Sequence, residues 1–178
     1  MRIATTIALL ALTCNAYGDS VAGFCERDGK RLVFTDGVAF EDAHEQGTVT
    51  SVIYLTAKPL DRAPLVACKE CATEMPESTF MSPRGDLIET QKDAIAQGWV
   101  EIHHNGGELD MSTLVNIMYI ADDGMHTGID GGNGKVVLDT RTDSRVVGKL
   151  VTEAREAPFN ETDMNCDITF DLAVGWPK

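Results

Sequence analysis

The residues of this sequence with the most clearly defined chemistry are two cysteines, Cys68 and Cys71. Their CxxC spacing is that of a thiol–disulfide redox site or of one half of a zinc site. A redox site needs a strand that leads into a helix beginning at the first cysteine. The segment 58–82 around this pair instead contains three of the six prolines. We therefore favour a disulfide over redox catalysis or a bound metal, and we expect no cofactor.

The remaining cysteines also favour disulfides. Cys14 lies in an N-terminal segment that we expect to be processed, which leaves Cys25 and Cys166 beside the CxxC pair. Four cysteines in an oxidising compartment are typical of two disulfides, and three connectivities are open. Cys166 lies on the core-facing side of a predicted strand, so its partner is either Cys25 or a cysteine of the CxxC pair.

Two adjacent histidines, His103 and His104, have the chemistry of metal ligands or acid–base groups. Neighbouring residues of a strand face opposite sides, so only one of them could join a given site. His44 and His126 lie in expected loops, and the sequence contains no HExxH or similar spacing. We predict no metal site here and keep His103 and His104 as candidate interaction residues on a hairpin.

A glycine-rich acidic loop over 122–134 is a further candidate site. Asp122, Asp123, Asp130 and Asn133 could offer oxygen ligands to calcium, but their spacing differs from that of an EF-hand loop. Acidic loops rich in glycine are usually solvated turns. We therefore expect Asp122, Asp123 and Asp130 to belong to an interaction surface.

The sequence carries no motif for nucleophilic hydrolysis. It contains no GxSxG elbow, and no serine has a local pattern that would set a base beside it. A hydrolase that uses two carboxylates has no distinguishing residue, because among 28 acidic residues some pair always lies at a suitable separation. We therefore predict no catalytic residue and favour a protein without enzyme activity.

The N-terminus has the form of a secretory signal peptide. Arg2 supplies a positive charge, and residues 3–12 form an apolar run too short to span a bilayer. Small residues at Ala16 and Gly18 fit cleavage before Asp19, which leaves a single domain over 19–178. In the competing interpretation Cys14 becomes the lipid-bearing first residue of an outer-membrane lipoprotein. We expect a periplasmic or secreted protein in either case.

The net charge of the chain limits the kinds of macromolecule that it can be expected to bind. The chain has 15 basic and 28 acidic residues and a formal net charge of −13. Nucleic acids and anionic membranes are bound mainly through Lys and Arg, so neither is an expected partner. No later apolar stretch is long enough to be a transmembrane helix. A basic protein is the partner that this charge favours.

The pattern of the chain predicts many short strands and one helix. Asp28-Gly29 is a hairpin turn between strands 24–27 and 30–35, and Asp36-Gly37 is a break followed by an acidic loop or helical turn over 41–47. Segment 58–82 is irregular, and an Asp86/Glu89 capping box starts a helix over 87–97 that packs across a sheet. The other expected strands are 48–57, 99–104, 108–114, 116–121, 135–140 and 145–153.

The clearest pattern lies at residues 164–174, where apolar and polar side chains alternate over eleven positions. This period of two indicates a strand with one face in the core and one in water. Seven or more strands separated by turns predict a mainly β fold, either a β-sandwich or an open β-barrel, and an immunoglobulin-like arrangement is one such sandwich.

Residues 99–174 resemble an uncharacterised group of bacterial exported β-rich domains. The matching features are WVEI at 99–102, Leu109-Asp110-Met111, RVVGKL at 145–150 and TFDLAV at 169–174. The resemblance implies a β-rich protein of the cell envelope and carries no catalytic residue over to this chain.

Together these features predict an exported, non-enzymatic binding protein of the bacterial envelope that acts through a protein-interaction surface. One specific form is an inhibitor or immunity protein whose acidic segments, such as 41–45 and 122–130, cap a basic partner. The alternative is a metal-binding or thiol-redox module that uses Cys68 and Cys71.

Overall fold

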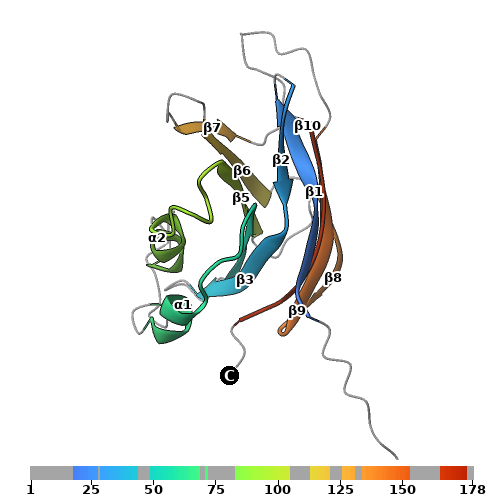
Figure 1. Cartoon of the computed structure of the whole chain (residues 1–178). Helices are drawn as coiled ribbons and strands as arrows, with labels where there is room; N and C mark the ends of the chain where they lie inside the picture. Colours follow the sequence, from blue (N-terminus) through green and yellow to red (C-terminus); the bar gives the residue numbers. More distant parts are fainter. Residues whose placement is uncertain are drawn as a thin grey trace, which may run out of the picture.

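A computed structural model describes residues 18–27, 29–43, 49–68, 71, 83–104, 113–120, 126–130, 134–152 and 165–175. These residues form two five-stranded antiparallel sheets and two short helices (Figure 1). The elements in chain order are β1 (Ser20–Arg27), β2 (Lys30–Phe34), β3 (Asp36–Ala43), β4 (Val49–Thr56), α1 (Ala63–Ala67), α2 (Pro83–Glu89), β5 (Gly98–His104), β6 (Thr113–Ile120), β7 (His126–Asp130), β8 (Gly134–Thr142), β9 (Arg145–Thr152) and β10 (Asn165–Ala173).

The two sheets differ in how the chain builds them. Sheet A has the strand order β2-β1-β10-β9-β8, so the first and the last strand are neighbours. Sheet B has the order β3-β4-β5-β6-β7, a meander of consecutive strands. The mainly β prediction is therefore confirmed, and of its two forms the structure has the sandwich. The hairpin at Asp28-Gly29 is also confirmed, because β1 pairs with β2 across this turn.

Two layers of apolar side chains hold the molecule together. The first lies between the sheets and includes Ile168 from sheet A and Ile53 from sheet B. The second lies on the other face of sheet B, where Leu65 of α1 and Ile88 of α2 pack against Phe40 and Tyr54. The helices therefore cover the side of sheet B that faces away from sheet A (Figure 1).

Strand β10 confirms the period-two prediction. Cys166, Ile168, Phe170 and Leu172 are buried, whereas the residues between them are exposed or half-buried. The predicted strand 48–57 is likewise confirmed as β4, and β8 and β9 lie where the strands 135–140 and 145–153 are expected.

The predicted break at Asp36-Gly37 falls slightly too late, because β2 ends at Phe34 in sheet A and β3 begins at Asp36 in sheet B. The acidic loop or helical turn expected over 41–47 is wrong for residues 41–43, which continue β3, and residues 44–47 lie outside the described residues. Asp36 is the first residue of β3, and its carboxylate accepts hydrogen bonds from the Arg62 guanidinium at 2.7 and 2.9 Å. It also accepts a bond of 2.7 Å from the backbone N–H of Leu60. An aspartate with such partners is a structural ion pair rather than a turn residue.

The predicted helix bounds are also wrong. Helix α2 ends at Glu89, and residues 90–97 form turns, although Ala94 and Ile95 are buried as expected. Asp86 lies in the first helical turn rather than at a cap. Gln91 leaves the helix because its side-chain amide donates to the Asp61 carbonyl and accepts from the Asp61 N–H, at 2.9 and 2.7 Å.

Two more segments differ from expectation. Segment 58–82 contains α1, which has Pro64 in its first turn, where a missing N–H has no cost. The expected glycine-rich loop 122–134 contains β7. The gap expected between the strands 108–114 and 116–121 is not present, because β6 runs from Thr113 to Ile120 without interruption. Residues 105–112 and 121–125 lie outside the described residues. No helix in the described part of the chain is long and apolar enough to cross a membrane.

The disulfide between Cys25 and Cys166 joins residues that are directly opposite in the β1–β10 register. It spans 141 residues, so removing it as Cys25→Ala/Cys166→Ala should lower the unfolding free energy by about 4 kcal/mol. The matched control, Cys68→Ala/Cys71→Ala, opens a bond between residues only three apart and should cost about half as much. Urea denaturation of the three proteins checks this order, and equal losses would contradict it.

Gly23 is the glycine on which the β1–β10 pairing depends. It has φ 142°, and a Cβ here would lie 2.1 Å from the Asp167 carbonyl oxygen. Gly23→Ala should therefore force the two strands apart and lower the unfolding free energy by about 3 kcal/mol or more. Gly29→Ala is the control, since its φ of 74° costs about 1 kcal/mol but its Cβ would meet open space. Equal effects in thermal denaturation would refute this account.

Candidate functional site

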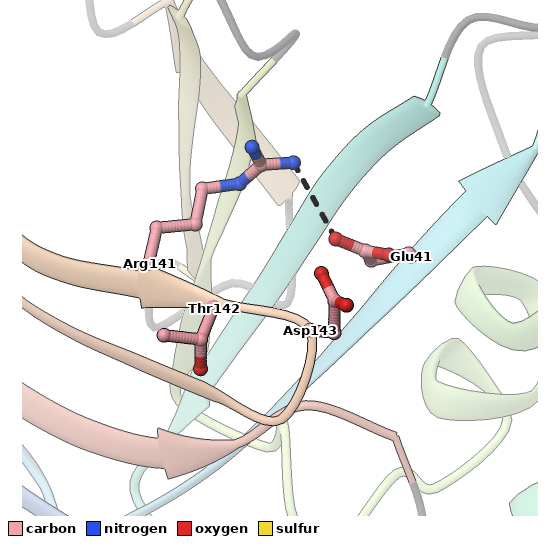
Figure 2. A pocket seen from close by; sticks show the side chains of 4 residues that line it. All are labelled: Glu41, Arg141, Thr142 and Asp143. Carbon is pink, nitrogen blue, oxygen red and sulfur yellow. Dashed lines mark hydrogen bonds and ion pairs between the residues drawn. The ribbon is translucent and has the colours of Figure 1, made fainter.

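A pocket with a volume of about 250 Å³ lies where the turn between β8 and β9 approaches the end of β3. Its lining residues are Glu41 from β3 and Arg141, Thr142 and Asp143 from β8 and the turn (Figure 2). We call it the Glu41 pocket. It joins the two sheets at one end of the sandwich, because β3 belongs to sheet B and β8 to sheet A.

Arg141 is the cation of the Glu41 pocket. Its Nε donates to Ser51 Oγ at 2.9 Å, which fixes the guanidinium above sheet B. Its Nη2 lies 3.4 Å from Glu41 Oε1, at the long end of a hydrogen bond. Both side chains are about one third exposed, so this pair contributes little net stability. Glu41 therefore keeps much of its negative potential toward the pocket.

Asp143 brings a second carboxylate into the pocket. Its side chain points toward the Glu41 carboxylate, as Figure 2 shows. The turn that carries it is held by Thr142 Oγ1, which accepts from the backbone N–H of Arg145 at 3.0 Å. Two like charges that converge beside one guanidinium repel each other. A cationic group placed between them would relieve that repulsion.

His104 lies behind the pocket, in the space between the sheets. It is directly opposite Ser51 in the β4–β5 register and shares its face of sheet B. Its side chain is buried, and this burial, together with the positive charge of Arg141, lowers the pKa of the imidazole below its usual value. His104 is therefore not a surface contact, contrary to its place among the candidate interaction residues.

This lowered pKa predicts a pH-dependent stability. The unfolded chain binds a proton at His104 below about pH 6.5, whereas the folded chain resists it until a lower pH. The contribution is present above pH 6.5 and is lost as the pH falls below it. His104→Gln should flatten the fall in urea-unfolding free energy between about pH 7 and pH 5. An unchanged slope would show that other groups cause it.

The opposite face of sheet B carries a second polar network. Tyr54 Oη donates to Glu101 Oε1 at 2.8 Å, and His103 Nε2 contacts the same oxygen. Tyr54 and Glu101 are buried, and burial, followed by the charge of Glu101, raises the pKa of the Tyr54 hydroxyl. His103 and His104 thus face opposite sides, as predicted, and His103 is held by a carboxylate under the helical layer.

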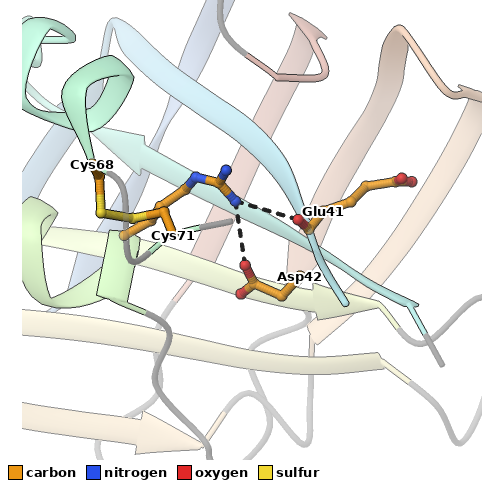
Figure 3. The surroundings of a disulfide bond; sticks show 5 residues. Glu41, Asp42, Cys68 and Cys71 are labelled. Atoms are coloured by element: carbon orange, nitrogen blue, oxygen red, sulfur yellow. Dashed lines mark hydrogen bonds and ion pairs between the residues drawn. A yellow bond between two sulfur atoms is a disulfide. The ribbon is translucent and has the colours of Figure 1, made fainter. Parts of the chain in front are cut away.

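Arg84 of α2 binds the end of β3 from this same side. Its Nη1 lies 3.5 Å from Asp42 Oδ1 and donates to the Glu41 carbonyl at 3.3 Å. Burial lowers the pKa of Arg84, while Asp42 acts in the opposite direction. The disulfide Cys68–Cys71 lies beside this strand end, in the surroundings of Glu41 and Asp42 (Figure 3). Adjacent residues of β3 therefore face two different polar sites.

All four cysteines predicted to form disulfides do so, and the open choice for Cys166 resolves to Cys25. Cys68 follows the last residue of α1 instead of starting a helix, so the arrangement that lowers a catalytic thiol pKa is not present at it. Its sulfur is bonded to Cys71 rather than free to bind a metal. Among the described residues, no group of three or more His, Cys, Asp or Glu side chains could hold a metal ion.

The structure does not describe the side chains of the remaining candidate residues. Asp130 and His126 lie in β7, and the structure describes only their backbone. Asp122, Asp123, Asn133 and His44 lie outside the described residues. Sequence reasoning missed the roles of Arg141, Ser51 and Asp143, because no local motif connects them and only strand register brings them together.

No protein-family model, curated protein or solved structure matches this chain. The resemblance of residues 99–174 to bacterial exported domains therefore stays a prediction.

Proposed function

We propose that this chain is an exported binding protein of the bacterial cell envelope that acts through a protein surface and not by catalysis. Its specific form is an inhibitor or immunity protein for a basic partner. The observation that carries the proposal is the Glu41 pocket, where the carboxylates of Glu41 and Asp143 converge at an open end of the sandwich. A lysine or arginine side chain of the partner would enter this pocket.

The electrostatics of the pocket support a cationic guest. Arg141 is fixed by Ser51 and reaches Glu41 only at 3.4 Å, so it does not fully neutralise the two carboxylates. A partner guanidinium could bind Glu41 and Asp143 together through charge-assisted hydrogen bonds. The net charge of −13 would speed the approach of a basic protein.

The other histidine and cysteine side chains that the structure describes support a binding role because structural contacts already occupy them. His103 is bound to Glu101, His104 is buried between the sheets, and the four cysteines form two disulfides. In the described part of the chain, the Glu41 pocket is an accessible feature that fits a binding function. A metal-binding function would need free thiolates at Cys68 and Cys71, and both sulfurs are in a disulfide.

The proposed location follows from the disulfides and the N-terminal sequence. Two disulfides fit an oxidising extracellular compartment. The signal-like residues 1–18 support periplasmic or secreted protein, with lipid attachment at Cys14 as the anchored form. The intact mass of protein recovered from the envelope distinguishes cleavage before Asp19 from a lipid adduct.

The test of the binding proposal is capture from an envelope extract with immobilised chain at low and high salt. We expect the wild-type chain to retain a basic protein that is released as the salt concentration rises. Glu41→Gln/Asp143→Asn should weaken the affinity for that purified protein at least about tenfold, since charged interfacial contacts contribute more than 1 kcal/mol.

The matched control is Asp86→Asn/Asp93→Asn, which removes the same charge from two exposed residues away from the pocket. It should bind as the wild type does, apart from a small change in association rate. If both double variants bind equally well, the Glu41 pocket is not the contact surface. If the captured protein stays bound as salt rises, the charge-based partner assignment is wrong.

A further inference from the structure

The two disulfides differ in accessibility. Cys25 and Cys166 are 3% and 0% exposed and lie in the core between the sheets. Cys68 and Cys71 are both partly exposed and lie beside α1, outside that core. A thiolate must reach a sulfur atom along the disulfide axis to exchange with it. Of the two disulfides, only Cys68–Cys71 joins residues that are partly exposed in the folded protein.

The two disulfides also differ in how much of the folded structure depends on each bond. Cys25–Cys166 joins β1 to β10 across 141 residues and closes sheet A. Cys68–Cys71 joins residues three apart, and its loss releases less chain entropy than the loss of Cys25–Cys166. Among the described residues, Cys68 and Cys71 belong to neither apolar layer and to no strand. The folded protein can therefore exist with Cys68 and Cys71 either oxidised or reduced.

We propose that Cys68–Cys71 is a reversible two-electron exchange site whose co-reactant is an external dithiol. A thiolate of the dithiol attacks one sulfur, the Cys68–Cys71 bond breaks, and the other cysteine leaves as a thiolate that takes up a proton. The second thiolate of the dithiol then attacks the mixed disulfide and closes its own disulfide. Two electrons pass to the cysteines, and the two thiol protons of the dithiol end on Cys68 and Cys71.

The short spacing explains why the co-reactant is a dithiol. After a monothiol attacks, the released cysteine stays within three residues of the mixed disulfide and has a high effective concentration there. It therefore expels the monothiol and restores the original bond. A dithiol escapes this reversal because its second thiol competes in the same intramolecular way.

The test is timed alkylation of the native wild-type chain. Dithiothreitol is added at pH 8, samples are quenched with acid and alkylated, and the label at each cysteine is read by mass spectrometry after digestion. We expect Cys68 and Cys71 to be labelled at least about tenfold faster than Cys25 and Cys166, whose sulfurs become accessible only when sheet A opens. Circular dichroism should show an unchanged β signal while only the first pair is reduced.

Two further arms complete the test. Reduced glutathione at equal thiol concentration should leave most of Cys68–Cys71 oxidised, and oxidised glutathione should restore the bond after dithiothreitol is removed. The control Cys68→Ala/Cys71→Ala should consume no dithiol under native conditions. Equal labelling of both pairs, or resistance of Cys68–Cys71 until the chain unfolds, would overturn the proposal.

Equal reduction by glutathione and dithiothreitol would overturn the dithiol assignment. None of these measurements uses a protein partner, so they succeed or fail independently of the binding proposal. A chain that exchanges thiols but binds no basic protein would support the exchange proposal alone. A chain that binds a basic protein but exchanges no thiols would support the binding proposal alone.

Discussion

The pairing of β1 with β10 is the constraint on which the rest of this structure depends. Seven residues of each strand face one another in an antiparallel register, and Cys25 lies directly opposite Cys166. The backbones come so close at Gly23 that no side chain fits between them. This pair holds β2 on one side and β9 with β8 on the other, so sheet A exists only when it has formed. The position of Arg141 at the end of β8 follows from it.

Strand β3 of sheet B contributes residues to two polar sites. Because side chains alternate along β3, Glu41 reaches the pocket between the sheets while Asp42 reaches Arg84 under the helices. The chain after β10 also crosses from one sheet to the other, since the N–H of Gly175 donates to the Ala39 carbonyl at 2.9 Å. The pocket is thus built from segments that meet only in the folded state.

The sequence was most informative where burial alone decides the pattern. One face of β10 lies wholly in the core, so its alternation of apolar and polar residues is unbroken. The prediction was less accurate where a polar residue has a distant partner: Asp36 was expected in a break, but it is the first residue of β3 and binds the half-buried Arg62. It was also wrong where side-chain bonds end an element, as Gln91 does after α2.

The candidate site was harder to predict than the fold for a physical reason. Cysteine parity indicated two disulfides, because the bond needs only proximity and an oxidising compartment. Ser51 and Arg141 are 90 residues apart in the chain. Their contact depends on the register of β4 and on the stacking of the two sheets. No local spacing records such a contact. His103 and His104 attracted attention as neighbours, yet the strand sends them to different layers.

The strand order of sheet A has a consequence for how the protein is made. Sheet B joins consecutive strands, so its contacts can form while the chain is still emerging from a ribosome. Sheet A cannot close until β10 has emerged, because β10 lies at its centre. Before that moment β1 and β2 have only each other, and a two-stranded hairpin alone is marginally stable. Sheet A therefore stays incomplete until β10 has been made, whereas sheet B can already be paired by then.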